Sequence, residues 1–122
     1  MSLFRDDFYT VIGSSHTETA FNFTIRINAN HGIFDGHFPQ NPVTPGVVQL
    51  EIIKELLSEG LGRAIHLVSL SNCKYLAILN PNTCGDIHVN IEYTLLDTGV
   101  QKAVVLLKNN EITFLKASGT YK

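Results

Sequence analysis

Residues 36–60 read GHFPQNPVTPGVVQLEIIKELLSEG, and this stretch decides the fold. Its first part is rich in Gly and Pro, which interrupt regular hydrogen-bonded structure, so a long, stiff loop is predicted before Thr44. Thr44 is a candidate N-cap, Pro45 falls in the first turn, and Gly60 or Gly62 stands near the stop. We therefore predict one helix that starts at Thr44 and runs to about Gly60.

The predicted helix is amphipathic. Five apolar residues share one arc of a 3.6-residue wheel: Leu50, Ile52, Ile53, Leu56 and Leu57. The opposite arc is polar, but it begins with Val47 and Val48, which would be misplaced on a wet surface. We therefore expect the start of that arc, including Glu51, to be covered by a second subunit. Lys54 and Glu55 are expected to emerge into solvent.

Strands are predicted on both sides of the helix. Residues 21–27 and 87–95 alternate apolar and polar side chains, the pattern of a strand with one buried face. Residues 103–107 are continuously apolar, as in a central strand, and residues 112–121 follow a hairpin turn. Residues 65–79 are mixed in pattern and are predicted to form one or two strands. The order predicts an α+β fold in which a lone helix packs on an antiparallel sheet.

Composition narrows the class of protein. A chain of 122 residues has the size of a single domain, and no apolar run approaches the roughly 18 residues that span a bilayer. The N-terminal residues show no secretion or transit pattern, which predicts a cytoplasmic protein. Nine basic residues against 11 acidic ones, without a basic cluster, argue against a nucleic-acid partner. Cys73 and Cys84 are too sparse for a disulfide framework or a zinc site.

Three residues in the quoted stretch fit one kind of chemistry. Removal of water from a 3-hydroxyacyl thioester needs a base at C2, donors at the thioester carbonyl and an acid at the C3 hydroxyl. An imidazole such as His37 can act as the base near neutral pH. The Gly46 amide would lie at the positive end of the helix, and Glu51 as a neutral carboxylic acid could release the proton.

Each of these residues also has a plainer interpretation. A single His in a turn is more often a structural hydrogen-bonding group than a catalyst, and a lone carboxylate on a polar helix face is usually solvated. Phe38 fits a core residue as well as it fits the wall of an acyl tunnel. The remaining histidines are expected to be structural: His16, His31, His66 and His88.

Taken together, residues 36–51 resemble the signature of the 3-hydroxyacyl-acyl-carrier-protein dehydratases of the FabZ and FabA type. That signature is GHFPxxPxxPGxxxxE, and every fixed position is matched. The resemblance implies a hotdog fold, with a long central helix wrapped by an antiparallel sheet. It also implies a homodimer with active sites at the interface and leaves higher oligomers open. The implied reaction uses neither a metal nor a redox cofactor.

The resemblance also implies roles for individual residues. His37 would be the base on C2 and Glu51 the acid at the hydroxyl, each from a different subunit. The Gly46 amide would donate to the thioester carbonyl, and the Val43 carbonyl would orient His37. The candidate substrate-binding residues are Gly46, Val43, Phe38 and Val47.

Several positions depart from the family pattern. Glu55 stands where Gln is usual, Ile52 where Ala is usual and Thr44 where Met is common, and an N-terminal Pro-His-Arg-Tyr-Pro segment is absent. The expected reaction is dehydration of a 3-hydroxyacyl thioester, on acyl carrier protein or coenzyme A, to the trans-2-enoyl form. The pathway stays open between fatty acid biosynthesis and a specialised acyl or polyene pathway. The alternatives are a non-catalytic hotdog protein that binds acyl thioesters and a hotdog thioesterase.

Overall fold

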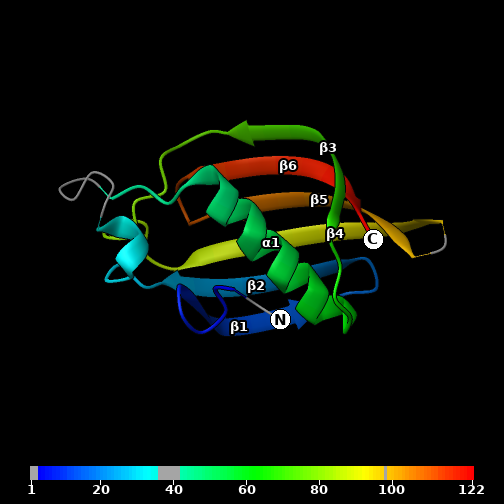
Figure 1. Cartoon of the computed structure of the whole chain (residues 1–122), viewed down its shortest axis with the longest axis horizontal. Coiled ribbons are helices and arrows are strands. Elements are labelled where there is room, and N and C mark those ends of the chain that lie inside the picture. The colour runs from blue at the N-terminus through cyan, green and yellow to red at the C-terminus, as the bar shows by residue number, and fades with distance from the viewer. Residues whose placement is uncertain (1–2, 36–41, 98) are drawn as a thin grey trace.

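A computed structural model describes residues 3–35, 42–97 and 99–122. These residues form one α-helix, one short 3₁₀ helix and a six-stranded sheet in the strand order β1-β2-β4-β5-β6-β3. The elements are β1 (Tyr9–His16), β2 (Ala20–Ile27), η1 (Gly32–Phe34), α1 (Gly46–Leu61), β3 (Leu67–Tyr75), β4 (Ile87–Asp97), β5 (Val100–Lys108) and β6 (Thr113–Tyr121). All neighbouring strands run antiparallel, and α1 crosses one face of the sheet (Figure 1).

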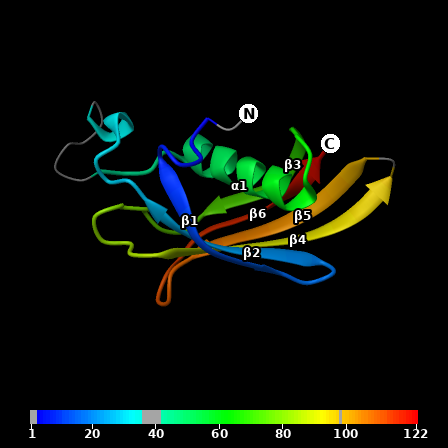
Figure 2. The ribbon, with the colours of Figure 1, turned by 90° about the horizontal axis from the view of Figure 1, so that it is seen from below.

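The core lies between α1 and the concave face of the sheet. Seen from below, the strands curve beneath the helix (Figure 2). Helix residues that contribute no exposed surface are Ile52, Ile53, Leu56 and Leu57, four of the five predicted for the apolar arc. They meet alternate residues of the central strands, such as Ile25, Ile87 and Ile91, because side chains two apart on a strand point to the same face. The predicted hotdog architecture is confirmed.

The N-cap of the helix lies one residue later than predicted. Pro45 is the N-cap and makes no side-chain capping bond, so the prediction that Thr44 caps the helix is wrong. The Thr44 hydroxyl is buried and has no hydrogen-bond partner among the described residues. At the other end Gly62 adopts φ 72°, a left-handed conformation that favours glycine, and its amide donates to the Ser58 carbonyl. In the part of the chain with coordinates, no helix is long and apolar enough to cross a membrane.

The predicted strands are confirmed, with two refinements. Residues 65–79 contain one strand, β3, which lies at a sheet edge beside β6. The opposite edge is β1, which the sequence pattern did not predict. The continuously apolar β5 lies between β4 and β6, as expected of a central strand.

The edge strand β3 exposes most of its side chains, apolar ones included. Eight of its nine residues are exposed, including Val68 at 60% and Leu70 at 39%. Its free edge also carries backbone groups that no described strand pairs with. An edge of this kind invites pairing with another strand.

Candidate active site

The start of α1 is fixed by short-range contacts of the segment before it. The Thr44 amide donates to the Leu79 carbonyl at 2.9 Å, which ties this segment to the chain that follows β3. The buried Gln49 side chain donates to the Thr44 carbonyl at 3.1 Å. The Val48 and Gln49 amides both donate to the Pro45 carbonyl, and the amides of Gly46 and Val47 have no backbone partner among the described residues. No acidic residue lies in the first turn to offset the positive helix end.

The Tyr75 ring lies close to Gly46. A Cβ atom at this position would lie 2.6 Å from Tyr75 Cζ, well inside van der Waals contact. The aromatic ring therefore covers one side of the helix start. Sequence reasoning did not single out Tyr75, because nothing local indicates that the end of β3 returns to the first turn of the helix.

A groove opens between the helix start and the end of β3. Its volume is about 370 Å³, and its walls are mostly apolar, with Ile78 70% exposed. Two buried oxygens without partners among the described residues belong to its lining, Thr44 Oγ1 and Gln49 Oε1. The predicted substrate-binding residue Val43 lines the same groove.

Glu51 projects from the other side of the helix. Its side chain is 19% exposed, and its Oε2 atom lies 3.3 Å from the Lys54 ammonium in an ion pair without hydrogen-bond geometry. Val47, one turn earlier, is 76% exposed. The chain itself therefore buries Val48, which is 4% exposed, and most of the Glu51 side chain, but it leaves Val47 exposed. Cover of Val47 by a second subunit stays a prediction.

Glu55 contradicts the expectation that it emerges into solvent. The residue is 5% exposed and accepts three hydrogen bonds. The amides of Leu3 and Phe4 donate to its Oε2 at 2.9 and 3.1 Å, and the Tyr9 hydroxyl donates to its Oε1 at 3.0 Å. Burial first, and then the neighbouring Glu51 carboxylate, raises the pKa of Glu55, against a lowering by its donors.

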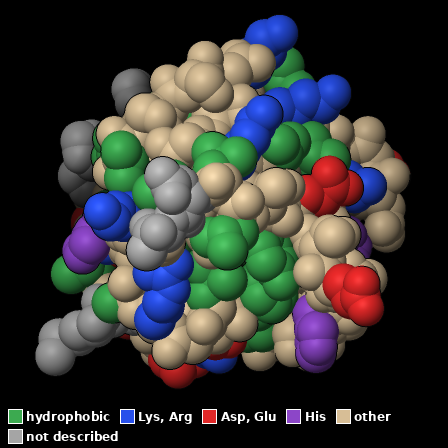
Figure 3. Space-filling model, turned by 90° about the vertical axis from the view of Figure 1, so that its right-hand side faces the viewer, with side chains coloured by type: hydrophobic (Ala, Val, Ile, Leu, Met, Phe, Trp, Pro, Cys, Tyr) green, Lys and Arg blue, Asp and Glu red, His purple; other side chains and the backbone are tan. Residues whose placement is uncertain are grey.

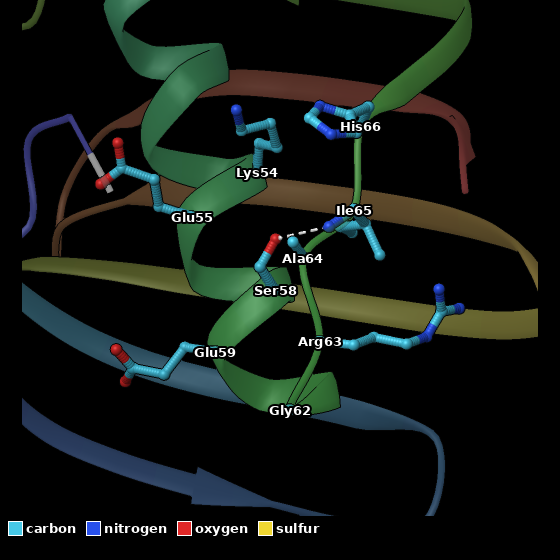
Figure 4. Close-up of a pocket in the computed structure, with 9 residues that line it drawn as sticks. All are labelled: Lys54, Glu55, Ser58, Glu59, Gly62, Arg63, Ala64, Ile65 and His66. Carbon is cyan, nitrogen blue, oxygen red and sulfur yellow. Dashed lines mark hydrogen bonds between the residues drawn. The ribbon is translucent and has the colours of Figure 1, made fainter. Parts of the chain in front are cut away.

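The two sides of the helix face opposite edges of the sheet. Gly46 meets Tyr75 of β3, whereas Glu55 meets the segment before β1 and the Tyr9 hydroxyl. At 3.6 residues per turn, Gly46 and Glu51 are about 140° apart around the helix axis. A further pocket of about 350 Å³ lies near the helix end. Figure 4 shows Glu55 and Glu59 on one side of α1 and Arg63 and His66 on the other. The helix-start amides and the carboxylates of one chain thus point to different surroundings.

The remaining candidates divide into two groups. His37 and Phe38 lie outside the described residues, so their predicted roles stay predictions. Two other histidines have structural contacts, as expected. His31 accepts from the Ile33 amide at 3.0 Å and caps η1, and the His88 ring lies 3.2 Å from the Thr24 hydroxyl.

The fold and the helix-centred arrangement define a hotdog protein, and the sequence places it in a family. A family model described as ApeI dehydratase, of the ApeI-like type, matches residues 13–103. That span covers 91 of the 122 residues, and the chain belongs to the ApeI-like dehydratase family.

Curated relatives are named as dehydratases. The chain is 29% identical over 102 residues to the 3-hydroxyacyl-[acyl-carrier-protein] dehydratase FabZ of Latilactobacillus sakei, which covers 74% of this chain and 73% of the relative. It is 33% identical over 86 residues to FabZ of Alkaliphilus metalliredigens, covering 64% of this chain and 56% of that relative. The chain thus spans little more than half of the second relative.

Solved structures confirm the hotdog fold. A chain from the dehydratase heterocomplex ApeI:P of Xenorhabdus doucetiae superposes with a TM-score of 0.71 at 18% identity, over 92% of this chain and 96% of that one. A thioesterase variant from Pseudomonas aeruginosa gives a TM-score of 0.62 at 13% identity, over 91% and 78%. At such identities the likeness concerns the fold alone.

Proposed function

We propose that this protein is a hydro-lyase that converts a 3-hydroxyacyl thioester, carried on acyl carrier protein, to the trans-2-enoyl thioester. The observation that carries the proposal is the helix start: two amides without intrahelical partners and no acid in the first turn, one turn before Glu51. Membership of a dehydratase family and similarity to proteins named FabZ support the same reaction.

The roles of the residues follow from the electron flow. His37 removes the proton from C2, and the electrons of that bond form the new double bond while the C3–O bond breaks. The helix-start amide of Gly46 stabilises the negative charge that develops on the thioester oxygen. Glu51 supplies the proton that turns the departing hydroxyl into water.

We further propose that the site is built by two copies of the chain. Gly46 and Glu51 face opposite flanks of one helix, so a single chain does not bring both to one substrate. The exposed edge of β3 and the exposed Val47 supply surface for a second copy. One end of the molecule also presents hydrophobic side chains close to Lys and Arg side chains (Figure 3). A homodimer joined along β3 would cover the exposed edge of β3 and bring the two halves of the site together.

The groove beside Gly46 is the proposed place of the acyl chain. It begins at the helix start, where the thioester carbonyl would bind, and continues along apolar side chains of the segment after β3. Thr44 and Gln49 belong to its lining, and their buried Oγ1 and Oε1 atoms have no hydrogen-bond partner among the described residues.

The experiment uses purified protein with 3-hydroxyacyl chains of several lengths on acyl carrier protein and on coenzyme A. Formation of the enoyl thioester, followed by absorbance and mass spectrometry, is the expected result. Release of free thiol instead would replace the proposal by the thioesterase alternative. Tight binding with neither product would favour a non-catalytic acyl-binding protein.

A further inference from the structure

Three neighbouring strands carry lysines and no acidic residue. The strands β5, β6 and β3 are adjacent in the sheet, and none of them contains an Asp or a Glu. Their lysines are all exposed: Lys74, Lys102, Lys108 and Lys116. The rest of the chain therefore holds five of the nine basic residues against all 11 acidic ones, a formal charge of −6 where the whole chain has −2. The lysines are separated in the sequence and come together only in the folded sheet.

The strand register places these lysines on the outer face of the sheet. Lys116 pairs with Lys74 of β3 on one side and with Leu106 of β5 on the other, and residues directly opposite each other share a face. Lys102 and Lys108 lie an even number of residues from Leu106, so they point to the same side. The alternate residues of β5 and β6 are buried in the core beneath α1. No described element covers the opposite, convex side, which we call the lysine face (Figure 2).

The pair of Lys74 and Lys116 has no acid to balance it. Like charges directly opposite each other on neighbouring strands destabilise a sheet. In the part of the chain with coordinates, no ion pair includes any of the four lysines. The next strand, β4, presents Glu92 opposite Val104 rather than opposite a lysine. An acidic partner would supply the negative charge that these three strands lack.

An open hollow with apolar walls lies on the lysine face. Its volume is about 310 Å³, and its lining includes Val104 and Leu106 of β5 and Lys116 of β6. Val104 is 44% exposed, although the strand is central in the sheet. An apolar centre within a charged rim is the usual anatomy of a surface that binds another protein.

We propose that the lysine face docks an acidic partner protein, and that this partner is the carrier protein that delivers the acyl thioester. The hollow favours a protein over a lipid surface, because a convex sheet meets a flat bilayer over a small area only. A helix of a partner protein can instead lie across the strands, with apolar side chains in the hollow and acidic ones against the lysines. The inference rests on the proposed function for the identity of the partner, but the docking surface itself does not.

The lysine face ends next to the proposed place of the acyl chain. Lys74 lies on the outer face, and the next residue, Tyr75, points to the inner face because successive side chains of a strand alternate. The Tyr75 ring lies close to Gly46 and lines the groove at the helix start. A carrier bound at Lys74 would therefore hold its thioester arm near the end of β3, at the entrance of that groove.

The direct test is the affinity of the purified protein for acyl carrier protein that bears a 3-hydroxyacyl chain, measured by isothermal titration calorimetry. Lys116→Glu should weaken binding about tenfold, because it removes a cation and repels an acidic partner. Its stability in urea unfolding should not fall, because the new carboxylate would face Lys74 and relieve the like-charge pair. Lys116→Arg keeps the charge and should bind as the wild type does.

Arg26→Glu is the matched control for the change in net charge. Arg26 lies on β2, outside the lysine face, and pairs with Asp86 at 3.1 Å. The ion pair is exposed and contributes little to stability, so this variant should fold and bind the carrier with unchanged affinity. Added salt should weaken carrier binding by the wild type more than by Lys116→Glu.

The kinetic arm compares two carriers of the same acyl chain. With acyl carrier protein, Lys116→Glu should raise KM about tenfold and leave kcat unchanged. With coenzyme A, which presents no acidic protein surface, KM and kcat should both stay at the wild-type values. A raised KM with both carriers would mean that Lys116 acts on the bound thioester rather than on a docked protein, and would overturn the inference.

The remaining outcomes keep this inference separate from the dehydratase proposal. Equal affinity of Lys116→Glu and the wild type for the carrier, or an equal loss in Arg26→Glu, overturns the docking surface while enoyl formation still stands. Binding to vesicles of anionic phospholipid that depends on Lys116, without carrier binding, replaces the protein partner by a lipid surface. Carrier binding that depends on Lys116 in a protein that forms no enoyl product sinks the dehydratase proposal alone.

Discussion

Glu55 joins two parts of the chain that are about fifty residues apart. Its carboxyl group accepts from the amides of Leu3 and Phe4 and from the Tyr9 hydroxyl, and so fixes the N-terminal segment on α1. Burial costs the charged form of a carboxyl more than the neutral form, so Glu55 holds its proton more tightly in the folded chain than in the unfolded one.

This difference predicts a pH-dependent contribution to stability. Because the folded pKa of Glu55 is raised above its usual value of 4.5, the native state binds more protons, and its contribution is lost as pH rises above that value. Glu55→Gln lacks this ionisation. We expect the stability of the variant relative to the wild type to increase as pH rises above 4.5, measured by urea unfolding at several pH values. A difference that is constant with pH would contradict the raised pKa.

Burial of Glu55 was not predictable from the helix pattern. At its position on the wheel, a glutamate normally faces solvent. The three donors that satisfy it belong to Leu3, Phe4 and Tyr9, far away in sequence. Tyr9 begins an edge strand that the pattern did not reveal. By contrast, the motif residues Gly46 and Glu51 could be selected from sequence, because their spacing within one helix is local information. Whether His37 and Phe38 join them stays a prediction.

At the scale of elements, two glycines of α1 set how closely the helix packs. A Cβ at Gly60 would lie 2.8 Å from the ring of Phe21, which is only 9% exposed and stacks on Tyr93 at 4.8 Å. A Cβ at Gly46 would instead meet the outer end of Tyr75, a side chain that is 49% exposed and can swing aside. The two sites therefore differ in how well a methyl group can be accommodated.

These contacts predict opposite outcomes for two Gly→Ala variants. Gly60→Ala should destabilise the protein by about 1–3 kcal/mol, the usual cost of overpacking a core. Gly46→Ala should leave stability nearly unchanged but reduce activity, since the methyl group and the displaced ring crowd the helix-start amide. Urea unfolding and initial rates measure the two effects. Greater destabilisation by Gly46→Ala than by Gly60→Ala would refute this packing account.

The strands show which elements sequence patterns can reveal. β2 and β4 alternate because one face packs on α1 while the other is solvated, and β5 is apolar because it is central. β1 has one buried residue, Tyr9, and a register shift between Val11 and Gly13 that breaks the alternation. Patterns report burial, so an edge strand that buries little gives a weak signal.

At the scale of the whole molecule, the two sheet edges differ in what they expose. Val68 on β3 is 60% exposed and Ile12 on β1 is 44% exposed. Each lies at a register shift of an edge strand, Val68 between Leu67 and Ser69 and Ile12 next to Val11. They are therefore matched positions on opposite edges.

In the proposed dimer, the β3 edge pairs with a second subunit, whereas the β1 edge stays free. Val68→Lys should convert a dimer to a monomer and abolish activity, because a charged side chain on an edge opposes strand pairing. Ile12→Lys should leave the dimer and its activity unchanged. Sedimentation equilibrium gives the mass of each species. A wild-type monomer, or a Val68→Lys protein that stays dimeric and active, would contradict a dimer joined along β3.

The proposed reaction depends on Glu51 as the acid that protonates the departing hydroxyl group. The most direct measurement is the rate of enoyl formation from a 3-hydroxyacyl thioester on acyl carrier protein, by the wild type, Glu51→Gln and the helix-matched control Glu59→Gln. We predict enoyl product from the wild type and the control, and a loss of at least about 100-fold in Glu51→Gln, the usual contribution of general acid–base catalysis. Equal rates for Glu51→Gln and the wild type, or no enoyl product from any of the three, would contradict the account.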